Sequence, residues 1–327
     1  MQRKYNLAYF AFALGLTALM VDVDAHAKIA FVSDRDGHSR EIYVMDDDGG
    51  NPRRLTNSPE DEWGASWSPD GKRIVFSASR DAGHWEIFDI YVMDADGGNP
   101  RNLTKNPGVD DSPSWSPDGK HIVFVSNRGN DNRWEMDIYV MAPNGGNPQN
   151  LTDNHAESNN MPSWSPDGGR IVFVSYRDEN AEIYVMNADG RNSQRLTNHP
   201  AEDWSPSWSP DGERIAFSSD RVGNLDIYVM DADGRNSRRL TNHPEDDWLP
   251  SWSPDGERIA FASDRGRSFD IYVIDADGGN LQNLTNVRFG EDTAPAWFHP
   301  NLEIAPAAVA PTGKKPTMWG GFKRVNQ

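Results

Sequence analysis

Short segments in which apolar and polar side chains alternate at every second residue recur along most of the chain. This period of two is typical of half-buried β-strands, and the segments are rich in β-branched and aromatic residues. One copy of the pattern predicts four strands, at 250–253, 258–263, 270–275 and 281–285. Pro254-Asp255-Gly256 forms a tight turn after the first strand, and Asp277-Gly278-Gly279 is typical of a hairpin turn. No segment shows a helical period.

The same four-strand unit repeats around a Ser-Trp-Ser-Pro-Asp-Gly motif. Five complete copies and one degraded copy place tryptophans 44 to 49 residues apart, at Trp67, Trp115, Trp164, Trp208, Trp252 and Trp297. Four antiparallel strands per repeat of this length predict an all-β, six-bladed β-propeller. The first second-strand pattern begins at Ile29, so Trp297 must supply the missing inner strand. Three N-terminal strands and one C-terminal strand would then close the ring, which removes open sheet edges.

The ends of the chain lie outside this pattern. Residues 1–27 are predicted to be a signal peptide, because Arg3 and Lys4 precede a 15-residue apolar run and Ala25-His26-Ala27 is a cleavage signal. An uncleaved membrane anchor is the alternative. The propeller is predicted over 28–300 and a basic tail over 301–327. No second apolar run exists, so we expect a mature protein without a membrane span, in the periplasm or secreted.

Composition narrows the classes of partner. The net charge of -18 argues against nucleic acid, since phosphate would be repelled, and favours cationic partners, metal cations or simple solubility. The chain has no cysteine, which excludes disulfides and thiolate metal sites.

The repeated segments resemble a known family. The repeats combine Trp-Ser-Pro-Asp-Gly, a second strand such as Arg258-Ile259-Ala260-Phe261, the Ser-Asp-Arg loop, Asp-Ile-Tyr-Val-Met-Asp and a closing Leu-Thr. This combination resembles the TolB-type propeller repeat. This resemblance covers all six blades and implies a six-bladed ring. It also implies a protein partner on one propeller face, such as the cell-envelope lipoprotein of the Tol–Pal system. TolB-type proteins of that system carry an α/β domain before the propeller, whereas here the propeller follows the signal peptide directly.

Acidic residues precede the first strand of nearly every blade. Five residues before the tryptophans stand Glu62, Asp110, Asn159, Asp203, Asp247 and Asp292. First strands line the central channel of a propeller, so these residues predict an acidic ring at one channel mouth that attracts a cation or a basic peptide. The alternative is that each carboxylate caps its own turn by accepting backbone N–H bonds.

Tryptophans distinguish some blades from others. Trp63, Trp204 and Trp248 stand four residues before the blade tryptophan, where other copies have Asp111, Asn160 and Thr293. Two longer loops, 81–88 and 129–136, carry Trp85 and Trp134. Aromatic side chains beside a channel mouth are typical partner anchors, and packing against a neighbouring blade is the alternative.

A second repeated set indicates ion pairs within or between blades. Every blade has an arginine after its second strand and a carboxylate at the start of its third, which are Arg35, Arg80, Arg128, Arg177, Arg221 and Arg265 with Glu41, Asp89, Asp137, Glu182, Asp226 and Asp270.

Catalytic and metal-binding motifs are absent from the sequence. It has no nucleophile elbow, zinc-protease helix motif or phosphate-binding glycine loop. His155, His199 and His243 occupy equivalent outer positions on different blades, too far apart to share a metal. We therefore expect a monomeric, non-enzymatic scaffold without cofactor or metal, which binds a protein or peptide. Two alternatives remain: a carbohydrate-binding or carbohydrate-processing propeller, and the accessory propeller of a peptidase.

Overall fold

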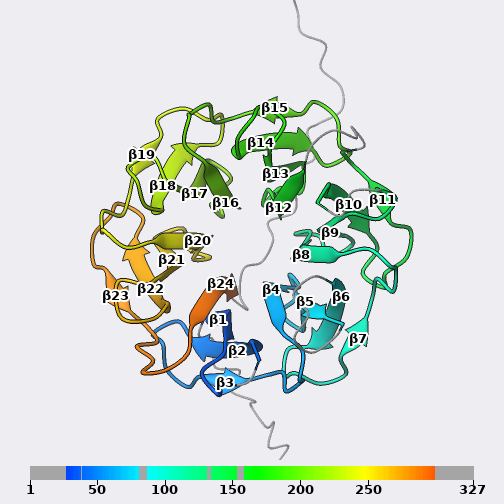
Figure 1. Ribbon diagram of the computed structural model, residues 1–327, viewed down its shortest axis with the longest axis horizontal. Coiled ribbons are helices and arrows are strands. Elements are labelled where there is room, and N and C mark those ends of the chain that lie inside the picture. The colour runs from blue at the N-terminus through cyan, green and yellow to red at the C-terminus, as the bar shows by residue number, and fades with distance from the viewer. Residues whose placement is uncertain (1–26, 38, 81–86, 131–133, 153–157, 299–327) are drawn as a thin grey trace, which may run out of the picture.

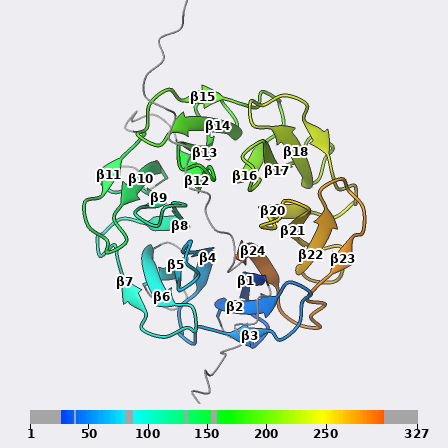
Figure 2. The same ribbon diagram turned by 180° about the vertical axis from the view of Figure 1, so that it is seen from behind.

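The computed structural model describes residues 27–37, 39–80, 87–130, 134–152 and 158–298. In this part of the chain, 24 strands form six four-stranded antiparallel sheets, arranged around a central axis as the blades of a propeller (Figure 1; Figure 2). The predicted all-β, six-bladed fold is confirmed. The predicted signal peptide, except Ala27, and the predicted tail lie outside the described residues.

The four strands of each blade follow one another from the channel outwards. The first blade contains β24 (Asp292–Phe298), β1 (Lys28–Ser33), β2 (Glu41–Asp46) and β3 (Arg53–Arg54). The second contains β4 (Glu62–Trp67), β5 (Arg73–Ser79), β6 (Phe88–Asp94) and β7 (Arg101–Asn102). The third contains β8 (Asp110–Trp115), β9 (Ile122–Ser126), β10 (Asp137–Met141) and β11 (Gln149–Asn150).

The other three blades follow the same order. The fourth contains β12 (Asn159–Trp164), β13 (Arg170–Ser175), β14 (Glu182–Asn187) and β15 (Gln194–Arg195). The fifth contains β16 (Asp203–Trp208), β17 (Arg214–Ser219), β18 (Asp226–Asp231) and β19 (Arg238–Arg239). The sixth contains β20 (Asp247–Trp252), β21 (Arg258–Ser263), β22 (Asp270–Asp275) and β23 (Gln282–Asn283).

The two middle strands of each blade form the core because both of their faces are covered by neighbouring blades. Their Ile, Val and Phe side chains are buried, except Val140 on the third strand of its blade, which is half-buried. A phenylalanine on the second strand lies opposite a tyrosine on the third in every blade, as Phe261 does opposite Tyr272. The six ring pairs have centroids 5.6 to 6.1 Å apart, a separation at which aromatic rings attract.

The two ends of the described chain close the ring, as predicted. β24 pairs antiparallel with β1, with Trp297 opposite Ile29. Phe298 then stacks on Trp67 of the second blade, with ring centroids 5.1 Å apart. The indole N–H of Trp67 donates to the Ala296 carbonyl oxygen at 3.2 Å. The aromatic pair and this hydrogen bond fasten the first blade to the second.

The repeated tryptophan motif has a structural role. In four blades the arginine that begins the second strand lies over the tryptophan of the next blade, as Arg73 does over Trp115 at 4.8 Å and Arg214 over Trp252 at 4.5 Å. In the turn that follows, Ser253 donates to Asp255 and Gly256 has φ +72°, a left-handed conformation that favours glycine. The motif therefore builds a turn and a cation–π contact between blades.

The antiparallel order gives the propeller two different faces. The channel face carries the loops from second to third strands and the loops that lead into the inner strands. The turn face carries the Pro-Asp-Gly turns and the loops from third to fourth strands, together with the paired residues Lys28 and Phe298. None of the described residues forms a helix long and apolar enough to cross a membrane.

Candidate binding surface at the central channel

A cavity of about 500 Å³ runs along the propeller axis. All six inner strands contribute to its wall, and Phe88 at the start of β6 adds one aromatic ring. The lining side chains are mainly serine, proline and apolar residues, with Trp63 and Trp248 on the side of the channel face. A concave, largely apolar site with few polar groups is typical of a ligand pocket.

A bulge in every inner strand shapes this wall. The strand register shifts at the same position in all six blades, for example between Trp248 and Ser251. The first residue of each bulge has a left-handed φ of 49° to 60°, and these residues are Gly64, Ser112, Met161, Ser205, Leu249 and Ala294. Five of them are not glycine, and such a conformation costs about 1 kcal/mol or more at each. Bulges of this kind re-aim side chains and often border functional sites.

The predicted acidic ring lies inside the blades and does not line the channel wall. Glu62, Asp110, Asp203, Asp247 and Asp292 are 0 to 2% exposed. Four of them accept hydrogen bonds from the arginine that follows the second strand of their own blade; Arg221 lies 2.6 Å from Asp203 and Arg35 lies 2.7 Å from Asp292. Burial raises the pKa of Asp292, whereas hydrogen bonds from Arg35 and Ser33 lower it. These four carboxylates are held by ion pairs, a partner that neither interpretation of the sequence included.

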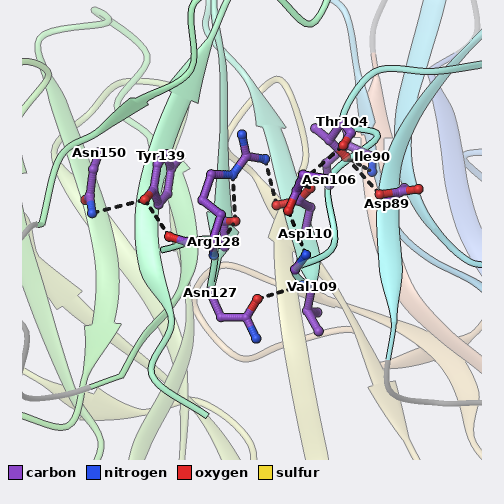
Figure 3. A network of polar contacts seen from close by, with 12 residues as sticks. Asp89, Ile90, Thr104, Asn106, Val109, Asp110, Asn127, Arg128, Tyr139 and Asn150 are labelled. Atoms are coloured by element: carbon purple, nitrogen blue, oxygen red, sulfur yellow. Dashed lines mark hydrogen bonds and ion pairs between the residues drawn. The ribbon is translucent and has the colours of Figure 1, made fainter. Parts of the chain in front are cut away.

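Figure 3 shows one such centre in the third blade. Arg128 donates to Asp110 at 2.8 Å through its Nη2 atom and to Ser126 at 2.9 Å through Nε. The same guanidinium lies 5.1 Å from the ring centroids of Phe124 and Tyr139. Asn106 also donates to Asp110. One arginine therefore joins the inner strand to the aromatic pair of the middle strands.

Glu62 departs from this arrangement. Arg80 of its blade instead binds Asp89 at 2.5 Å and the Gly108 carbonyl oxygen at 2.8 Å. Glu62 accepts hydrogen bonds from Ser58 and Thr56 and lies beside Glu41. Burial, followed by the proximity of Glu41, raises the pKa of Glu62 to about 8. A protonated Glu62 can donate to Glu41, whose Oε2 atom is buried and has no other partner among the described residues.

The second predicted set forms repeated ion pairs, but mostly with other partners. Only Arg80 binds the third-strand carboxylate of its own blade, while Arg35, Arg128, Arg221 and Arg265 bind first-strand carboxylates. All six third-strand carboxylates bind a fourth-strand residue, and Asp89 does so in addition to Arg80; the partners are Arg54, Asn102, Asn150, Arg195, Arg239 and Asn283. In these four blades the arginine joins the end of the second strand to the inner strand of the same blade.

The predicted tryptophans differ in exposure. Trp63 is half-buried beneath the guanidinium of Arg40 at 4.4 Å, and Trp248 packs against Phe269 at 5.7 Å. Both line the cavity. Trp204 packs edge-on against Tyr176 at 5.4 Å and contacts the core instead. Trp134 is 70% exposed just before β10, whereas Trp85 lies outside the described residues.

Asp111 is a channel residue that the sequence interpretation passed over. Among the described residues that line the cavity, it is the only one with an ionisable side chain. It occupies the position of Trp63 and Trp248 in its own blade. Blade-to-blade variation at this position was the signal in the sequence, but it was followed only for tryptophan.

Comparison with known proteins places this geometry in a family. A model described as the TolB beta propeller domain matches residues 83–159, 153–241 and 221–305. No curated protein sequence is significantly similar to the chain.

Solved structures extend the comparison. TolB from Acinetobacter baumannii is 25% identical with a TM-score of 0.72; the match covers 83% of this chain and 66% of that one. A putative TolB from Agrobacterium tumefaciens is 25% identical with a TM-score of 0.63, covering 81% and 89%. The tricorn protease is 18% identical with a TM-score of 0.63 and shares the fold alone, over 80% of this chain and 26% of that one. The chain thus spans slightly less than two thirds of the Acinetobacter protein.

Proposed function

Since the chain belongs to the TolB beta-propeller domain family, we propose that it is a non-enzymatic scaffold that holds a protein or peptide partner at the central channel, on its channel face. The observation that carries this proposal is the cavity itself, which is open, largely apolar and bordered by Trp63 and Trp248. Tryptophan is a frequent anchor of protein interfaces because it buries a large area at small entropic cost.

Exposed apolar side chains support a partner that extends beyond the cavity. Trp134, Val222 and Phe289 are 70%, 51% and 73% exposed. Each lies in a loop of the channel face, since Trp134 and Val222 stand between second and third strands and Phe289 precedes β24. A partner larger than the cavity would cover these three side chains on the same face.

The predicted acidic ring has a supporting role in this proposal. Its carboxylates lie within the blades, where the buried ion pairs hold the inner strands in place. The partner would therefore contact Trp63, Trp248 and Trp134 directly. The signal peptide predicted over 1–27 supports a partner in the periplasm or outside the cell, such as an envelope lipoprotein. No described feature favours hydrolysis, and we assign the chain no reaction.

Peptide selection tests the proposal. A random dodecapeptide library displayed on phage would be selected on the purified protein, and the enriched peptides measured by calorimetry. We expect the double variant Trp63→Ala/Trp248→Ala to weaken binding at least tenfold. Leu281→Ala is the matched control, because Leu281 is 43% exposed in a loop of the turn face and its variant should bind normally. Failure to enrich any peptide, or peptides equally sensitive to both variants, would overturn the proposal.

A further inference from the structure

Asp111 is the one ionisable side chain among the described residues that line the channel cavity. It is the second residue of β8, which faces β20 across the propeller axis (Figure 1). The other described side chains of the cavity wall are serine, alanine, proline, methionine, leucine, phenylalanine and tryptophan, with glycine at Gly64. Such a wall gives a charged ligand group a single electrostatic partner.

The carboxylate of Asp111 is held in a fixed orientation. The Ser77 hydroxyl and the Ser112 backbone N–H both donate to its Oδ1 atom, each at 2.6 Å. Ser77 lies on β5 of the neighbouring blade, and Ser112 is the left-handed residue of the bulge in β8. In the described part of the chain, neither an ion pair nor a hydrogen bond reaches Oδ2. The second oxygen is therefore available to a ligand.

This carboxylate lacks a compensating cation. The first-strand carboxylate beside it, Asp110, is paired with Arg128, but no described basic residue pairs with Asp111. Burial raises the pKa of Asp111, the two hydrogen bonds lower it, and the charge of Asp110 raises it further. A carboxylate that is partly desolvated in a cavity wall and lacks a cationic partner costs stability, and that cost is recovered when a cation arrives.

The remainder of the cavity suits an organic cation. Trp248 lies on the opposite wall, and its indole N–H is buried without an acceptor among the described residues. Trp63, Phe88 and Met161 add aromatic and apolar surface. Aromatic faces attract ammonium and guanidinium groups, and the aliphatic stem of lysine or arginine packs on apolar walls. A hard metal ion would instead require several oxygen ligands, of which a carboxylate supplies at most two.

We propose that Asp111 recognises one lysine or arginine side chain, which a partner peptide inserts into the central channel against Trp63 and Trp248. This inference rests on the proposed function, since it specifies the chemistry of the partner at the same cavity. The net charge of -18 fits such a partner, because a negative protein attracts basic segments.

Two probes test the inference. The first is Nα-acetyl-arginine amide, compared with the neutral citrulline analogue and followed by NMR of the Trp63 and Trp248 indole N–H signals. The second is the best peptide from the selection above, with each lysine replaced by norleucine and each arginine by citrulline. Asp111→Asn keeps an oxygen that can accept both hydrogen bonds while removing the charge. Glu213→Gln, an exposed position next to a turn, is the matched control.

We expect neutral analogues and Asp111→Asn each to weaken binding at least tenfold, without additivity, and Glu213→Gln to bind as the unaltered protein does. Peptides that depend on Trp63 and Trp248 but not on Asp111 or on their own charge would overturn this inference and leave the proposed function standing. Binding of the arginine amide at Asp111 without any enriched peptide would overturn the proposed function, and with it the peptide partner, and would leave only a site for a free cationic side chain. Calcium binding that Asp111→Asn abolishes would assign the carboxylate to a metal and overturn the inference.

Discussion

Replacing Arg265 by methionine tests whether the buried arginine–carboxylate pairs stabilise the ring. Arg265 Nη2 lies 2.7 Å from both carboxylate oxygens of Asp247, and its Nε donates to Ser263 at 2.8 Å. Its guanidinium also lies 4.9 Å from the Tyr272 ring centroid. The side chain of Asp247 is fully buried and that of Arg265 is 12% exposed. Removing the arginine therefore leaves a carboxylate that water cannot reach.

The expected loss follows from this burial. Breaking a buried ion pair from one side costs about 3–5 kcal/mol in the free energy of unfolding. Exposed pairs contribute only about 0–1 kcal/mol. Arg235→Met is the matched control, because Arg235 and Asp233 pair at 3.6 Å with side chains 81% and 58% exposed. The double variant Asp247→Asn/Arg265→Met should recover part of the loss, since it leaves no unpaired charge.

Urea unfolding at pH 7, followed by tryptophan fluorescence, would measure these differences. The midpoint should fall clearly for Arg265→Met, barely for Arg235→Met, and to an intermediate extent for the double variant. If Arg265→Met and Arg235→Met were equally mild, the pair would not stabilise the ring, and the argument from burial would be refuted.

Three further predictions concern other parts of the ring. Glu62→Gln should flatten the pH dependence of stability, because the folded protein raises the pKa of Glu62 and so favours its protonated form. The free energy of unfolding of the unaltered protein should therefore fall by on the order of a few kcal/mol as pH rises from about 4.5 to 8. Unfolding midpoints that change with pH by the same slope in both proteins would contradict this. Phe298→Ala should lower the free energy of unfolding by about 1–3 kcal/mol, because the ring stacked on Trp67 is lost. Phe289→Ala should change thermal unfolding little, because that side chain is 73% exposed. Equal losses would argue that the Phe298–Trp67 stack does not help to close the ring. Asp111→Asn should raise the melting temperature at pH 7 but not at about pH 2, where the carboxyl is protonated in both folded and unfolded states. A lower melting temperature at pH 7 would show that the charge is compensated.

The architecture could be predicted from the sequence because each blade repeats the same local information. Tryptophans at regular spacing, Pro-Asp-Gly turns and alternating strands determine a four-stranded unit, and the position of Trp297 indicates which strand closes the ring. These signals act between residues close in the sequence or at fixed repeat distances. They can therefore be recognised without knowing how the blades pack.

The site was less predictable because it depends on which side chains meet in three dimensions, within one blade and between blades, and on backbone geometry. All six loop arginines are visible in the sequence, yet whether Arg265 reaches Asp270 on its own hairpin or Asp247 on the inner strand is decided in three dimensions. Similarly, Asp111 and Asp110 are neighbours in the sequence, but alternation along β8 gives one to the channel and the other to the blade interior. The bulge at Ser112 adds a hydrogen bond from its backbone N–H to Asp111, which no sequence pattern predicts.

Hydrogen–deuterium exchange of the protein with and without a selected peptide tests the central claim most directly. We expect the peptide to slow exchange in the inner strands β4, β8 and β20, around Trp63, Asp111 and Trp248, and in channel-face loops such as the one containing Phe289. The turn face, including Leu281, should exchange at an unchanged rate. Protection confined to the turn face or to the outer strands would contradict the account and place the binding surface elsewhere on the propeller.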